Sequence, residues 1–120
     1  MLKIKSTQLE AFAAINREIF IEKLILLLRT EFESAENISD EEFKRVIPIQ
    51  INRANRYLIF LDVNIAKYVI SAFLMGEEFD EKFNGAKKIL EQIRVHENKK
   101  TEELEEWTLQ IFENLENNND

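Results

Sequence analysis

The stretch AKYVISAFLMGEEFDE, residues 66–81, decides the fold class of this chain. A nearly continuous apolar run meets Gly76, one of only two glycines, and the chain then becomes acidic. Counted from Tyr57, the run approaches the ~20 apolar residues that a membrane span needs. Asp62 and Lys67 interrupt it, and a charge buried mid-bilayer costs about 2.5 kcal/mol or more. We therefore predict a buried helix of a folded domain, without insertion into a membrane.

Local signals set the expected ends of this helix. Asp62 or Asn64 is the expected N-cap, because their side-chain oxygens accept hydrogen bonds from first-turn N–H groups. The helix should end at Met75, with Gly76 as a C-terminal cap of positive φ. Apolar residues occupy most of its sides, so it should be buried: Ile65, Val69, Ile70, Ala72, Phe73 and Leu74.

The acids after this glycine are Glu77, Glu78, Asp80 and Glu81. They lack the alternating oxygen ligands, the internal glycine and the terminal bidentate glutamate of a calcium-binding loop. We predict a hydrated acidic connection in which Phe79 packs into the core.

The composition is that of a folded acidic protein. Hydrophobic residues make up 45% of the 120 residues and charged residues 32%, which argues against disorder. The net charge of −7 repels phosphate backbones, so we do not expect nucleic acid as a partner. The absence of cysteine excludes disulfides and thiolate metal sites. The first ten residues do not resemble a secretory signal, and we expect a cytoplasmic location.

Two glycines and one proline permit few tight turns, which favours helices joined by short polar connections. We predict an all-α, single-domain bundle of about five helices, irregular rather than a simple up-down four-helix bundle. The domain should cover residues 1–116, with a disordered tail at 117–120.

The first predicted helix begins at Thr7, whose spacing from Glu10 matches a capping box. Its apolar residues form more than one stripe: Ile21, Ile25, Leu28 and Phe32 make a second, and Ile15, Ile19 and Leu26 a third. A helix that is apolar on most sides is either central in its own core or in need of a partner. We favour the central position.

The second predicted helix begins with another capping-box spacing, between Ser39 and Glu42. Pro48 lies inside its pattern and removes a backbone hydrogen bond, so we expect a kink or a split. One apolar face runs along this helix: Phe43, Val46, Ile47, Ile51, Ala54, Tyr57 and Leu58.

Three residues of the second helix lie off this apolar face. Ile49 is a candidate for an exposed apolar residue. Arg53 and Arg56 should be solvated or paired with nearby acids, and the alternative is a docking site for a partner's carboxylates.

Two helices are expected to complete the chain. The first covers residues 83–93, with Ala86, Ile89, Leu90 and Ile93 turned inward. The last begins near Thr101 and carries an apolar stripe opposite a row of glutamates: Leu104, Trp107, Ile111, Phe112 and Leu115. We expect this stripe to pack on the domain, and the alternative is that Trp107 and Phe112 anchor a partner.

The sequence contains no pattern typical of catalysis. Its single histidine, His96, lies in a charged connection, and the residue three positions earlier is Ile93, so the Glu-x-x-His pair of di-iron bundles is absent. Two glycines cannot build a phosphate-binding loop. We predict a non-enzymatic protein without a metal or cofactor.

Three segments carry a family resemblance: LKIKSTQLEAF, IFIEKLILLLRTEF and AKYVISAFLMGEEFDE. They are similar to a group of small, mostly helical bacterial proteins encoded within type VI secretion effector loci. The similarity spans roughly residues 2–90 and leaves out the last helix. The matching positions are Gln8, Leu9, Phe12, Phe20, Leu24, Phe32, Tyr68, Gly76, Phe79 and Asp80.

The resemblance implies a co-chaperone that acts beside an effector-loading adaptor and holds a toxic effector before secretion. It implies no catalytic residue. The chain departs from the pattern at Pro48 and at the link YLIFLDV, where a more polar, glycine-containing connection is expected.

Three functions therefore remain open. The first is a co-chaperone or adaptor that binds a secretion effector or its loading adaptor. The second is an immunity protein that blocks a toxin's active site, for which acidic charge is suited. The third is a homo-oligomer whose apolar stripes meet each other. The partner-binding candidates are Ile21, Ile25, Phe32, Ile49, Arg53, Arg56, Trp107 and Phe112.

Overall fold

The computed structural model describes residues 16–118, with side chains as far as Asn114, and this part of the chain is all-α, as predicted. Its elements are α2 (Arg17–Glu31), a 3₁₀ turn η1 (Glu33–Asn37), α3 (Asp40–Arg56), α4 (Asp62–Met75), α5 (Phe79–Lys82), α6 (Asn84–Leu90) and α7 (Glu97–Asn118). Residues 117 and 118, predicted as a disordered tail, belong to α7. None of the described helices is long and apolar enough to cross a membrane.

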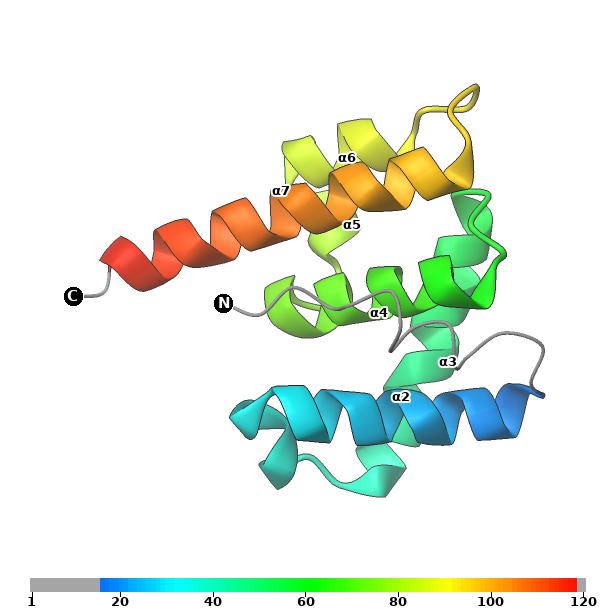
Figure 1. The fold of residues 1–120 in the computed structure, drawn as a ribbon, viewed down its shortest axis with the longest axis vertical. Helices are drawn as coiled ribbons and strands as arrows, with labels where there is room; N and C mark the ends of the chain where they lie inside the picture. The colour runs from blue at the N-terminus through cyan, green and yellow to red at the C-terminus, as the bar shows by residue number, and fades with distance from the viewer. Residues whose placement is uncertain (1–15, 119–120) are drawn as a thin grey trace.

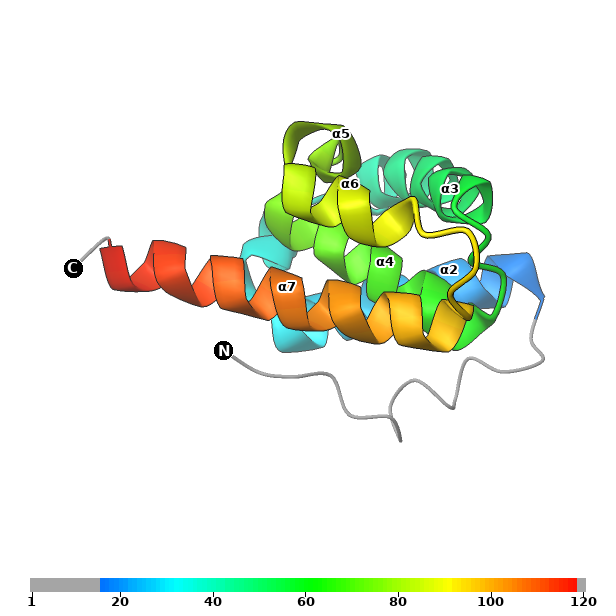
Figure 2. The same ribbon diagram turned by 90° about the horizontal axis from the view of Figure 1, so that it is seen from above.

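Helix α4 occupies the centre of the fold. It lies between α2 and α7, while α3, α5 and α6 pack on one side of these three helices (Figures 1 and 2). Asp62 and Lys67 are its only charged residues, so it can be surrounded by other helices at little desolvation cost. The prediction that the first helix is central is wrong, since α2 leaves Leu26 67% exposed and Ile19 42% exposed.

Helix α2 begins at Arg17, and the helix start predicted at Thr7 lies outside the described residues. Asn16 is its N-cap, with extended backbone and with Oδ1 accepting the N–H of Ile19 at 3.0 Å. This bond satisfies one of the backbone donors that a helix start leaves unpaired. The predicted capping box at Thr7 and Glu10 lies outside the described residues.

Helix α3 begins as its sequence predicts and continues through its proline. Ser39 is the N-cap, and its Oγ accepts the N–H of Glu42 at 3.1 Å. We expected a kink or a split at Pro48, and the split does not occur, because α3 is continuous from Asp40 to Arg56. Proline has no N–H to donate to the Lys44 carbonyl. Lys44 is exposed, so water can donate a hydrogen bond to that carbonyl instead.

The two ends of α4 differ from the prediction in detail. Neither Asp62 nor Asn64 is the N-cap, which is Leu61 and has no side-chain cap. At the other end Gly76 has the expected positive φ of 109°, but its ψ of 154° lies outside the left-handed helical region. Only glycine readily adopts this combination, and the N–H of Gly76 still donates to the Ala72 carbonyl at 2.9 Å.

The acidic connection after α4 is only partly hydrated. Phe79 is fully buried, as predicted, but Asp80 is also buried, with 3% of its surface exposed. Nη1 of Arg53 donates to one carboxylate oxygen of Asp80 at 2.8 Å, and the Tyr57 hydroxyl donates to the other at 2.7 Å. These two contacts allow the carboxylate to leave water, because a buried charge needs partners.

The helices predicted at 83–93 and from Thr101 have other boundaries. α6 ends at Leu90, and Ile93, expected to face inward, is 80% exposed. α7 begins at Glu97, one turn earlier than predicted, because His96 caps it. The carbonyl of His96 accepts the N–H of Lys100 at 3.0 Å, and its Nδ1 accepts the N–H of Asn98 at 3.1 Å.

Candidate functional site

The link between α3 and α4 exposes large apolar side chains to solvent. Leu58, Phe60 and Leu61 are 49%, 59% and 49% exposed, whereas Ile59 between them is fully buried. Leu58 has a φ of 64°, and it is the one non-glycine residue of the described chain with positive φ. A leucine in this conformation costs about 1–3 kcal/mol and persists only where surrounding contacts hold it.

One of these contacts is the carboxylate of Glu97, in the first turn of α7. It accepts the N–H of Phe60 at 3.2 Å and the N–H of Leu61 at 2.9 Å. It thereby pairs backbone donors beside the start of α4, where the N-cap residue Leu61 has no side chain to do so. A carboxylate is also favoured by the positive end of the α4 dipole.

The buried amide of Asn64 extends this attachment to the next turn of α7. Nδ2 of Asn64 donates to Glu97 Oε1 and to Asn98 Oδ1, both at 2.8 Å. Oδ1 of Asn64 accepts the hydroxyl of Thr101 at 2.9 Å. Asn64 therefore acts as a bridge between α4 and α7 and not as a cap.

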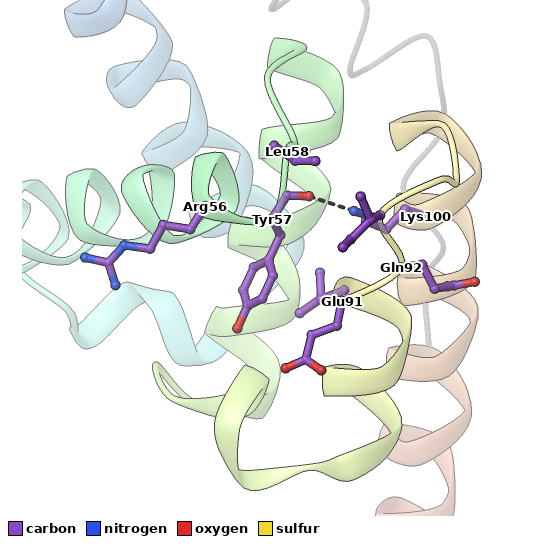
Figure 3. Close-up of a pocket in the computed structure, with 8 residues that line it drawn as sticks. Arg56, Tyr57, Leu58, Glu91, Gln92 and Lys100 are labelled. Atoms are coloured by element: carbon purple, nitrogen blue, oxygen red, sulfur yellow. Dashed lines mark hydrogen bonds between the residues drawn. The ribbon is translucent and has the colours of Figure 1, made fainter.

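Lys100 supplies the other attachment of the link. Its side chain is almost fully buried, and Nζ donates to the Tyr57 carbonyl at 2.7 Å (Figure 3). Burial lowers the pKa of the Lys100 ammonium, and the nearby Glu97 carboxylate opposes part of this shift. Glu97 and Lys100 together hold the backbone of the link at Tyr57, Phe60 and Leu61, so its exposed side chains are presented on a fixed backbone.

The link between α6 and α7 brings Ile93 to the same end of the molecule. Ile93 and Leu58 line a common pocket of about 390 Å³, together with Leu90 and Lys100. Figure 3 shows this pocket, with Leu58 and Lys100 labelled. In this view the Arg56 guanidinium points away from Lys100. We call Leu58, Phe60, Leu61 and Ile93 the link patch.

The predicted candidates on α3 have different surroundings. Arg53 is engaged within the molecule by Asp80, as the favoured interpretation proposed. Arg56 is exposed and lines the pocket beside the link patch. Ile49 is 42% exposed, and it lies with Arg53 around a separate, polar pocket of about 360 Å³.

The candidates on α2 contribute to the core. Ile25 is buried, and Ile21 and Phe32 are partly buried and pack against the core. The ring of Phe32 lies 5.4 Å from that of Phe73 in α4. These three side chains therefore have internal contacts.

Trp107 and Phe112 differ in their surroundings, although both lie on the predicted stripe of α7. The Trp107 ring lies 6.5 Å from Phe79 and 5.5 Å from Phe83, and it packs against the core. Phe112 is partly exposed, beyond these aromatic contacts. The side chain of Leu115, on the same stripe, lies outside the described residues.

The described residues contain no group of three or more His, Cys, Asp or Glu that could hold a metal ion. The polar clusters around Asp80 and Asn64 consist of mutually satisfied hydrogen bonds, which is the pattern of structural contacts. What the site offers chemically is apolar area beside cationic side chains, which suits binding of another protein surface.

Sequence reasoning did not include the link patch among the candidates. A signal existed, because YLIFLDV is apolar where a connection between helices is normally polar. The helical pattern assigned Leu58 to the buried face of the second helix and Ile93 to the buried face of the helix predicted at 83–93. Only the true ends of α3 and α6 place both in solvent.

No protein-family model matches this chain, and no match was found among curated proteins or among solved structures.

Proposed function

We propose that this protein is a non-enzymatic protein-binding module that binds its partner through the link patch. The main observation behind this proposal is that three large apolar side chains are exposed on the link between α3 and α4, which Glu97 and Lys100 hold in place. Contiguous exposed apolar surface on a small protein is typical of interaction sites. A rigid backbone lowers the entropy lost on binding, which strengthens association.

The sequence resemblance supports a more specific role, that of a cytoplasmic co-chaperone for a type VI secretion effector or its loading adaptor. A chaperone of this kind covers apolar surface on its client until delivery. The link patch could meet such surface directly. Full burial of one large apolar side chain contributes about 1.5–3 kcal/mol, so a half-exposed residue offers about half of that.

The test is a pull-down of the tagged protein from the cytoplasm of its own cells, with identification of captured proteins by mass spectrometry. Wild type should capture a secretion effector together with its adaptor. The double variant Phe60→Ser, Leu61→Ser should lose both, because the patch becomes polar. Leu26→Ser is the matched control, since Leu26 is equally apolar and exposed on α2.

Circular dichroism first establishes that each variant is folded. Equal capture by wild type and the Phe60, Leu61 variant would exclude the link patch as the binding surface. Capture of no secretion component by wild type would contradict the co-chaperone role itself.

The net charge of −7 favours one alternative, an immunity protein that is attracted electrostatically to a basic toxin. In that case wild type captures the toxin without an adaptor. Expression of this protein alone would then rescue cells from the toxin, which a loading chaperone need not do.

A further inference from the structure

We propose that, in the absence of a partner, the link patch is covered by the C-terminal end of α7 from a second copy of this chain. The copies would associate head to tail. The proposal concerns the same surface as the function above but does not depend on the identity of any partner.

The end of the molecule that carries the link patch is less acidic than the rest. Three cations are exposed here: Arg56 at the end of α3, Arg94 on the link between α6 and α7, and Lys99 on the first turn of α7. The acids of the same segments are Asp62, which is half-buried, Glu91, which lies 4.0 Å from Lys87, and Glu97, whose carboxylate binds the link. An apolar patch with exposed cations around it therefore forms one end of a protein whose net charge is −7.

The other end of the molecule has the complementary chemistry. The last turns of α7 extend past the ends of α4 and α6 in both views (Figures 1 and 2). Ile111 and Phe112 are partly exposed there, and Glu113 is exposed. The last turn of α7 contains no basic residue, and the negative end of the helix dipole adds to its acidity.

Geometry requires that the two ends meet between copies. The first turn of α7 holds the link patch through Glu97, and 22 residues of helix at about 1.5 Å each place its far end about 33 Å away. The end of α7 cannot reach the patch of its own molecule. Two acidic ends repel each other, as do two cationic ends, so charge selects the head-to-tail arrangement.

Such a contact is heterologous, because two different surfaces meet. It leaves one patch and one helix end open in every dimer, so association continues into chains or closes into a ring. The contact is small, and we expect it to be weak and to depend on concentration and salt.

A mixing experiment tests this arrangement by sedimentation velocity. The patch variant is Phe60→Ser, Leu61→Ser, and the tail variant is Phe112→Ser. Each alone should remain monomeric, because each lacks one of the two surfaces. An equimolar mixture should form dimers and nothing larger, since one variant retains its helix end and the other retains its patch. Wild type should form species that grow with concentration.

A charge swap provides a second measurement that does not alter packing. Arg94→Glu and Glu113→Lys should each weaken wild-type association about tenfold or less, as expected for exposed charges. The variant that carries both substitutions should regain part of this loss. Leu26→Ser, on α2, should associate as wild type does.

Three results would overturn the proposal. Wild type could stay monomeric up to about 1 mM, where even weak contacts form. The mixture of patch and tail variants could stay monomeric. The patch variant alone could dimerise as wild type does, which would indicate an interface elsewhere. None of these results bears on capture of an effector, so the two proposals fail separately.

Discussion

Tyr57 is partly buried and Tyr68 fully buried, and their ring centroids lie 6.3 Å apart, but their hydroxyls have different environments. The Tyr57 hydroxyl donates to the buried Asp80 carboxylate at 2.7 Å. The Tyr68 hydroxyl is buried and has no hydrogen-bond partner in the described structure. A buried polar group without a partner costs free energy, so one of these hydroxyls stabilises the fold and the other does not.

We expect opposite effects from removing the two hydroxyls. Tyr57→Phe should lower the free energy of unfolding by about 1–2 kcal/mol, because Asp80 loses a donor. Tyr68→Phe should leave it unchanged or raise it by up to about 1 kcal/mol, because an unpaired hydroxyl is removed. Urea denaturation measures both. A larger loss in Tyr68→Phe than in Tyr57→Phe would mean that the Tyr68 hydroxyl is paired in solution.

Both tyrosines also make the stability depend on pH. Burial, followed by the hydrogen bond to Asp80, raises the pKa of Tyr57, and burial followed by the charge of Asp80 raises the pKa of Tyr68. Above the ordinary value of 10.0 the unfolded chain loses these protons while the folded chain keeps them. The unfolded state then binds fewer protons, so stability falls as the pH rises.

The measurement is urea denaturation at about pH 9 and pH 11. Wild type should lose stability between them, and Tyr68→Phe should lose less. Lys100 acts in the opposite direction, because its lowered pKa makes stability rise with pH up to its ordinary value of 10.5. An equal loss in wild type and in Tyr68→Phe would show that Tyr68 does not contribute.

At the level of elements, α6 and α7 approach each other through a glycine. A Cβ placed on Gly85 would lie 2.5 Å from Nε1 of Trp107. Trp107 packs against Phe79 and Phe83, so a movement of its ring away from α6 would weaken these contacts. Glycine within α6 therefore serves close packing of two helices, at the cost of a weaker helix former.

The substitution Gly85→Ala tests whether close packing of α6 on α7 or helix propensity has the larger effect on stability. Helix propensity alone would raise the free energy of unfolding by up to about 1 kcal/mol. We expect a net loss of about 1–3 kcal/mol instead, because the methyl group forces α6 and α7 apart. In a Trp107→Leu background the same substitution should be neutral or stabilising. Stabilisation by Gly85→Ala in wild type would show that Trp107 has room to move.

The attachment of the α3–α4 link to α7 gives a second prediction for elements. Glu97→Ala removes the acceptor of the Phe60 and Leu61 N–H groups. Amide hydrogen exchange at these two residues should become faster by about tenfold or more, with little change in the centre of α4. Glu102→Ala, an exposed acid of the same helix, is the control. Unchanged exchange would show that the link does not depend on Glu97.

At the level of the whole molecule, the surface charge changes along the long helix α7. Its first turn lies beside the cationic links, and its last turn carries no basic residue. Although the chain as a whole is acidic, the two ends of the molecule therefore differ in charge. The proposed head-to-tail contact between copies rests on this difference between the ends and not on the net charge.

Local patterns in the sequence determined much of this protein. The capping signal at Ser39, the apolar faces of α3 and α4 and the stop at Gly76 depend on neighbouring residues, so spacing was enough to predict them. The prediction made from Asp62 and Lys67 agrees with the structure, in which no described helix is long and apolar enough to cross a membrane. The all-α class followed from the same short-range patterns.

Only the tertiary structure decided the partners of residues far apart in the chain. Asp80 is buried because Arg53 and Tyr57 meet it across 27 and 23 positions, and no local spacing encodes such a pairing. The exposure of the link patch depends on Glu97, more than 30 residues away, which holds Phe60 and Leu61. Sequence periodicity reports which residues share a helix face, whereas packing between helices decides which faces are covered and which remain open.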